Sequence, residues 1–145
     1  MSAAAAATAG AVTFVWLGMV LGISFLEAPL KFRAPGVTVP IGLGIGHLVF
    51  RALNAVEAVL ACVVVVAVAV GDAPARVLGP TAGAVAVLLA QLAAVRPWLN
   101  RRSDRVLTGQ DGGEGPRSRA HLVYVALEVA KAAVLIALGV CLLTV

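Results

Sequence analysis

Four polar side chains fall at helical spacing in the apolar segment that follows residue 40: His47, Arg51, Asn54 and Glu57. At about 100° per residue, the first three share one face of a helix, and Glu57 lies about 60° beyond Asn54. An imidazole, a guanidinium, an amide and a carboxylate in one line could bind a polar or ionic solute. The segment therefore contains a candidate site.

A second polar stripe of the same kind lies near the end of the chain: His121, Tyr124, Glu128 and Lys131. The two segments begin His-Leu-Val-aromatic, and five of the eleven positions counted from each histidine are identical. This similarity predicts an internal repeat, in which Glu57 and Lys131 occupy corresponding positions. Both stripes then run from the same end of the molecule toward its middle.

The charges of the two stripes balance, because Arg51 and Lys131 are basic while Glu57 and Glu128 are acidic. Ionisable groups deep in a bilayer are costly unless they pair or meet water, so both stripes should face inward. We expect the ion pairs Glu57–Lys131 and Arg51–Glu128 in a self-neutralising cluster. A cluster of this kind can bind a ligand, or it can fix the register of the helices without one.

Two acceptors outside the stripes are further candidates for the same interior. Glu27, near the end of the first apolar segment, could pair with Arg51 or Lys31. Gln91, in the third apolar segment, could add a hydrogen bond.

The elements that must position these groups are apolar to a degree that requires lipid. The 145-residue chain is 61% hydrophobic and 12% charged, and its mean hydropathy is +1.04. Four runs are long enough for spanning helices: residues 11–30, 41–70, 77–99 and 121–144. We therefore expect an all-α, integral membrane four-helix bundle in one transmembrane domain, residues 1–145. Its two tandem two-helix hairpins should be related by a pseudo-two-fold axis along the membrane normal.

Basic residues predict the orientation of the bundle. Eight of the eleven Lys and Arg residues lie in or beside the first and third connections, at 31–40 and 100–120. By the positive-inside rule these connections should be cytoplasmic and both termini outside. The Gly-rich 100–120 segment should form a mobile loop. Clustering in loops, without interleaved aromatic residues, argues against nucleic-acid binding despite a pI of about 9.8.

The segment Gly22-Ile-Ser-Phe-Leu-Glu-Ala-Pro-Leu-Lys-Phe32 and the two His-Leu-Val segments resemble the small four-span bacterial membrane proteins of the transmembrane-protein-205-like group. This resemblance covers most of the chain and rests on no catalytic motif. It implies a multi-pass protein of the bacterial cytoplasmic membrane and no particular activity.

The function expected from these features is that of a non-enzymatic small-solute or ion transporter or channel component, without a cofactor. A four-helix bundle leaves little room for a pore, which makes a homo-oligomer plausible. One alternative is a haem- or metal-binding membrane protein that uses His47 and His121 as ligands. A further alternative is an enzyme, because Arg51-Ala-Leu-Asn54-Ala-Val-Glu57 resembles the second helix of membrane-associated eicosanoid and glutathione metabolism proteins. The Arg-to-Asn spacing differs from that family by one residue.

Overall fold

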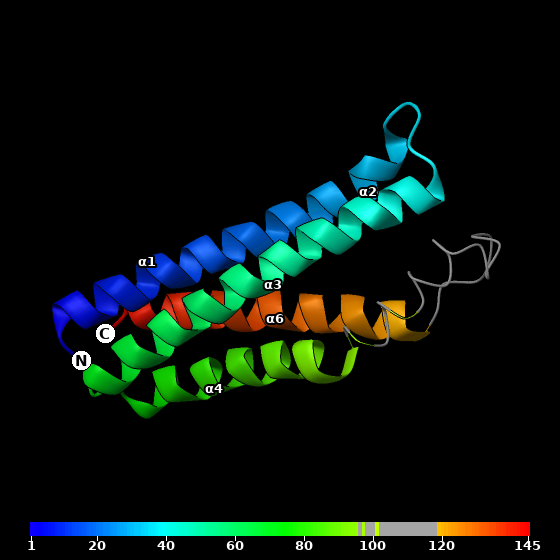
Figure 1. Ribbon diagram of the computed structural model, residues 1–145. Coiled ribbons are helices and arrows are strands. Elements are labelled where there is room, and N and C mark those ends of the chain that lie inside the picture. Colours follow the sequence, from blue (N-terminus) through cyan, green and yellow to red (C-terminus); the bar gives the residue numbers. More distant parts are fainter. Residues whose placement is uncertain (96, 98–100, 102–118) are drawn as a thin grey trace.

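A computed structural model of the chain describes residues 1–95, 97, 101 and 119–145 (Figure 1). Within these residues the regular structure is helical, and no strand occurs. Four helices are long and apolar enough to cross a membrane: Ala3–Arg33, Val39–Val70, Ala75–Ala93 and Leu122–Leu143. The prediction of an all-α chain with four apolar helices is confirmed. Most of the predicted 100–120 loop lies outside the described residues.

The first long helix is built from several windings in series, and the others are more regular. The elements in chain order are α1 (Ala3–Val20), η1 (Leu21–Glu27), α2 (Ala28–Leu30), η2 (Lys31–Arg33), α3 (Val39–Val70), α4 (Ala75–Ala90), η3 (Gln91–Val95) and α6 (Arg119–Leu143).

Helix α1 begins at Ala3, earlier than the predicted residue 11, and local chemistry accounts for the difference. The Ser2 hydroxyl accepts a hydrogen bond from the backbone N–H of Ala5, which caps the helix. The following alanines have the highest intrinsic helix propensity. Thr38 caps α3 in the same way by accepting from the N–H of Ile41, and Pro40 occupies the first turn, where its missing N–H costs nothing.

Two π-helical windings precede prolines. Segments η1 and η3 each end two residues before a proline, Pro29 and Pro97, and the backbone of Pro97 is again helical. A proline ring clashes with the carbonyl four residues earlier, and a wider turn relieves that clash. In η1 the N–H of Ala28 accordingly donates to the carbonyl of Ile23, five residues back. The widened turns place Ser24, Glu27 and Gln91 out of phase with a regular α-helix.

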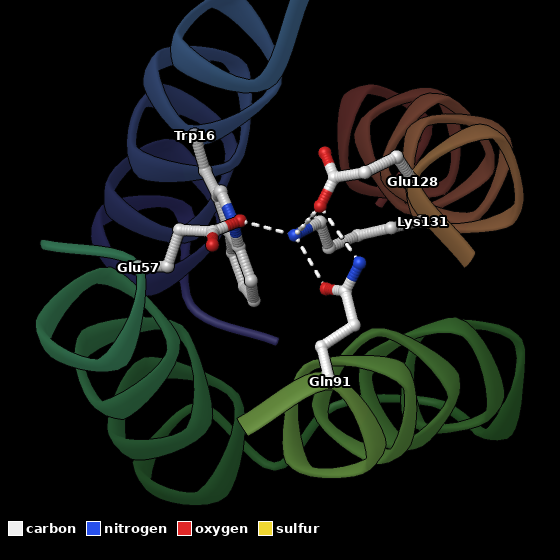
Figure 2. Close-up of polar contacts among 5 residues, drawn as sticks. All are labelled: Trp16, Glu57, Gln91, Glu128 and Lys131. Atoms are coloured by element: carbon white, nitrogen blue, oxygen red, sulfur yellow. Dashed lines mark hydrogen bonds and ion pairs between the residues drawn. The ribbon is translucent and has the colours of Figure 1, made fainter. Parts of the chain in front are cut away.

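The four long helices lie side by side, with both termini and the α3–α4 turn at one end (Figure 1). We call this the termini end. The α1–α3 connection, residues 34–38, lies at the opposite end, which we call the loop-1 end. Viewed along the bundle, α1 packs against α3 and α6, and α4 packs against α6 (Figure 2). Helices α3 and α6 therefore occupy opposite corners, and their inward side chains meet across the centre.

Apolar side chains fill the bundle around and beyond its middle. One buried cluster surrounds the centre: Trp16, Val20, Ala61, Ala84, Leu88, Ala132 and Leu135. A second cluster occupies the termini end: Ala9, Val64, Val68, Val77, Leu138 and Leu142. Large apolar side chains also face outward, as with Leu48 at 69% exposure and Val70 at 81%. An outer surface of this kind suits a lipid environment rather than water.

Candidate functional site

Five polar-tipped side chains from four helical segments meet at the centre of the bundle (Figure 2): Trp16 from α1, Glu57 from α3, Gln91 from η3, and Glu128 and Lys131 from α6. We call them the central cluster. All five are at most 2% exposed. Because each of the four long helices contributes a member, the cluster links all four of them.

The ammonium group of Lys131 is the hub of the central cluster. Its Nζ lies 2.5 Å from Glu57 Oε1 and 2.8 Å from Glu128 Oε1. It also donates to Gln91 Oε1 at 2.8 Å. A protonated lysine has three N–H donors and no acceptor. Each of the three donors therefore has one partner, and the lysine has no capacity left for another ligand.

The two carboxylates are bound in parallel ways. Glu57 Oε1 accepts from the lysine and from Trp16 Nε1 at 2.9 Å. Glu128 Oε1 accepts from the lysine and from Gln91 Nε2 at 2.7 Å. Each carboxylate thus has one oxygen with two donors. The other oxygen of each, Oε2, is buried and has no hydrogen-bond partner.

The expectation of a self-neutralising cluster is wrong in its charge count. The central cluster holds two carboxyl groups and one amine, because Arg51 lies on the exposed part of α3. With both glutamates ionised, the cluster would carry one net negative charge inside an apolar bundle. A buried uncompensated charge is strongly unfavourable.

The predicted pair Glu57–Lys131 is confirmed, and the pair Arg51–Glu128 is wrong. The buried face of α3 is set by Leu53, Glu57, Ala61 and the valines that follow at helical spacing. Arg51 is two residues, or about 160° of rotation, from Leu53 on this face. Glu128 binds Lys131 and Gln91 instead.

The remaining predicted residues lie between the centre and the loop-1 end. Tyr124 is buried one turn before Glu128. Its ring packs edge to face against the ring of Phe50, with 5.8 Å between the ring centroids. His47 and Asn54 are half-buried on α3. Glu27 pairs with Lys31 at 3.7 Å, one of the two partners expected for it. The side chain of His121 lies outside the described residues.

Lys31 marks the loop-1 end of the interior. Its ammonium lies 5.6 Å from the ring centroid of Phe32 and 5.5 Å from that of Phe50, within reach of cation–π attraction. Ser24 Oγ, in the π-helical winding nearby, is buried without a hydrogen-bond partner. Polar groups thus continue from the central cluster toward this end.

Trp16 is the member that the polar stripes did not indicate, whereas the expected hydrogen bond of Gln91 is confirmed. An indole counts as apolar in a hydropathy pattern, although its N–H needs an acceptor when buried. The signal available in the sequence was a lone tryptophan in the middle of the first apolar run.

Metal-ligating side chains do not gather in the part of the chain that the structure describes, where no group of three or more His, Cys, Asp or Glu is suited to hold an ion. The haem or metal hypothesis for His47 and His121 stays a prediction, because one of the two side chains is not described. The enzyme hypothesis also stays a prediction. The three residues of that motif have different environments: Arg51 is exposed, Asn54 is half-buried and Glu57 pairs with Lys131.

Comparison of the chain with protein-family models, with curated proteins and with solved structures finds no match. The resemblance to the transmembrane-protein-205-like group therefore stays a prediction.

Proposed function

We propose that this chain is a multi-pass membrane protein that moves a small ion or polar solute, as a transporter or channel component. The central cluster is its ion-binding or coupling site. The observation that carries the proposal is the pair of buried carboxylate oxygens without partners, Glu57 Oε2 and Glu128 Oε2. A cluster that served only to align helices would be expected to satisfy its polar atoms, since each unsatisfied atom costs stability.

The charge count supports the same proposal. Two acidic side chains and one basic side chain bind together at 0–2% exposure. Ionisable groups inside membrane helices are rare, and they usually mark ion or solute pathways. The excess acid gives the site a capacity for one positive charge from outside the chain.

The architecture that we propose around the site is a repeat of two parallel-related hairpins. Glu57 and Lys131, at corresponding repeat positions, contact each other across the bundle centre, where a pseudo-two-fold axis would pass. When Leu26–Arg33 is aligned with Ala94–Arg101, Pro29 and Pro97 correspond, and each follows a π-helical winding. This correspondence supports the repeat in α1 and α4, where side-chain similarity is weak.

We further propose that the bundle spans the cytoplasmic membrane of a bacterium, with the loop-1 end in the cytoplasm and both termini outside. The placement of Lys31 and Arg33 at the loop-1 end supports this orientation. Transport through the bundle requires either a rearrangement of the termini end or a path between copies in a homo-oligomer.

The test is charge movement by purified protein in liposomes adsorbed on a solid-supported electrode, with a rapid switch to each candidate solute. Small carboxylic acids, amino acids, monovalent cations and pH steps make up the panel. The matched variant is the triple substitution Glu57→Leu, Glu128→Leu and Lys131→Met, which keeps side-chain volume and removes the charges. We expect a transient current from the wild type with at least one solute and none from the triple variant.

Helical content and the thermal unfolding midpoint of the triple variant serve as the control. Replacement of buried ion pairs by apolar side chains of similar size is often neutral or stabilising, so the variant should fold. Equal currents from the folded variant and the wild type would refute a role of the central cluster in transport. No current above protein-free liposomes for any solute would refute the proposed function.

A further inference from the structure

The charge imbalance of the central cluster has a specific chemical remedy. Both carboxyl groups contact the same ammonium group of Lys131, so one positive charge faces two acidic side chains. Lys31, the next cation along the interior, is engaged with Glu27. Among the side chains that the structure describes, no further cation contacts the two carboxyl groups, so a species that enters the cluster from outside can supply the balancing charge.

A metal cation does not fit the space between the two carboxylates. The Nζ of Lys131 already occupies the point on which both Oε1 atoms converge (Figure 2). The two unpartnered Oε2 atoms turn away from the lysine (Figure 2). Since Na⁺ or Ca²⁺ needs several oxygen ligands around one point, a single isolated oxygen binds neither well. A proton needs only one oxygen.

We propose, on the basis of the function proposed above, that the ion handled by the central cluster is a proton and that Glu128 carries it. The proton bonds to Glu128 Oε2, which leaves Glu57 ionised and Lys131 charged. The cluster then has no net charge. On release, the proton passes to water at the loop-1 end, and the excess negative charge returns to the cluster.

Geometry selects Glu128 over Glu57. Lys131 Nζ lies 2.5 Å from Glu57 Oε1, compared with 2.8 Å from Glu128 Oε1. The closer carboxylate has the stronger charge-assisted contact and gains more from staying ionised. Each carboxylate has one further donor, the amide of Gln91 for Glu128 and the indole of Trp16 for Glu57. Both donors are neutral, so they do not change which carboxylate the lysine favours in its ionised form.

The position of Glu128 also gives it the better route to water. It lies one turn closer to the loop-1 end than Lys131, and Tyr124 is one further turn along α6. Beyond Tyr124 come Phe50, Lys31 and the partly exposed Glu27. In the opposite direction the apolar cluster of the termini end closes the interior. We therefore expect the proton to exchange on the loop-1 side.

The test is infrared spectroscopy of the reconstituted wild-type protein near neutral pH, with attention to the C=O stretch of protonated carboxylic acids. We expect one such band that belongs to a buried group, and Glu128→Asp should shift it. The matched variant Glu57→Asp, which keeps the same charge count, should leave the band in place. Glu128→Gln should abolish the band, because one carboxylate and one lysine then balance.

The wild-type spectrum alone decides the first point, so the proposal stays testable if a variant fails to fold. Absence of a protonated-carboxyl band in the wild type would overturn the proton assignment. A band that moves in Glu57→Asp and stays in Glu128→Asp would overturn the choice of Glu128. Electrode currents without the band would leave transport standing with another ion, whereas the band without any current would leave the proton site standing without transport.

Discussion

The two halves of the bundle interior differ in chemistry although the same four helices build both. From the centre to the loop-1 end, the buried or half-buried polar groups include Tyr124, Ser24 and Lys31. From the centre to the termini end, the buried polar side chains are Thr13 and Thr81. The hydroxyl of Thr81 bonds back to the carbonyl of Val77 in its own helix.

This difference shows how a small bundle can hold charges without becoming a pore. One half packs aliphatic side chains and supplies stability, while the other provides polar contacts for the charged groups. The central cluster lies at the boundary between the two halves. Four substitutions test this division, from the largest expected loss of stability to the smallest.

Lys131→Met should give the largest loss, because two buried carboxyl groups lose their shared cation. Removal of one partner of a buried ion pair costs about 3–5 kcal/mol. The free energy of unfolding in detergent, from denaturant titration followed by circular dichroism, measures it. The matched control is Arg33→Met at the exposed loop-1 end, which should cost less than about 1 kcal/mol. Equal losses would mean that Lys131 does not organise the cluster.

Leu138→Ala tests the apolar half, where this side chain is fully buried. A Leu→Ala change in a packed core costs about 2–5 kcal/mol, and more if the cavity does not collapse. The same titration measures the loss, with Val140→Ala, at a position 54% exposed, as the control. If Leu138→Ala also speeds deuterium exchange at the central carboxyl groups, the apolar half is confirmed as the barrier to water.

Trp16→Phe removes the indole N–H that binds Glu57 while it keeps an aromatic ring in the core. A hydrogen bond to a charged group contributes about 1.5–3 kcal/mol, so we expect a loss near the lower value. As the control, the same substitution is made in the triple variant, whose cluster carries no charges. There the loss of stability should be smaller, because only the change from indole to the smaller phenyl ring remains. Identical losses in the two backgrounds would argue against the bond.

Glu27→Gln should have the smallest effect. Its carboxylate is 33% exposed and lies 3.7 Å from Lys31, and exposed pairs of this kind contribute about 0–1 kcal/mol. Glu57→Gln, in the buried central cluster, should lower the free energy of unfolding more when it is measured by the same titration. A larger effect at Glu27 would place a second structural centre at the loop-1 end.

Much of the architecture is predictable because hydrophobic run length is a strong signal. Four apolar runs give four helices, and the repeated His-Leu-Val segments align Glu57 with Lys131 closely enough to predict their contact. The helix ends were less predictable, since the polyalanine segment and the Ser2 cap extend α1 well beyond the span that lipid requires.

The members of the central cluster were only partly predictable. The stripe on α3 was assigned to the wrong side of the helix, and one member, Trp16, counts as apolar in a hydropathy pattern. The stripe through His47, Arg51 and Asn54 is rotated by about 100° from the buried face that Leu53 and Glu57 define. Helix packing decides which of these faces turns inward, and because the face of Leu53 and Glu57 does so, Glu128 binds Gln91 rather than Arg51. Trp16 could not be recognised as polar by hydropathy, and the π-helical winding at Gln91 was not predicted, although Pro97 lies two residues beyond its end.

The length of helix α3 bears on the membrane that its apolar surface suits. Helix α3 has 32 residues, which is about 48 Å of helix, whereas a hydrocarbon core is about 30 Å thick. In a bilayer of that thickness, a helix of this length would have to tilt, or the lipids beside it would have to stretch. Bilayer thickness is therefore a physical variable to which this protein should respond, most strongly around α3.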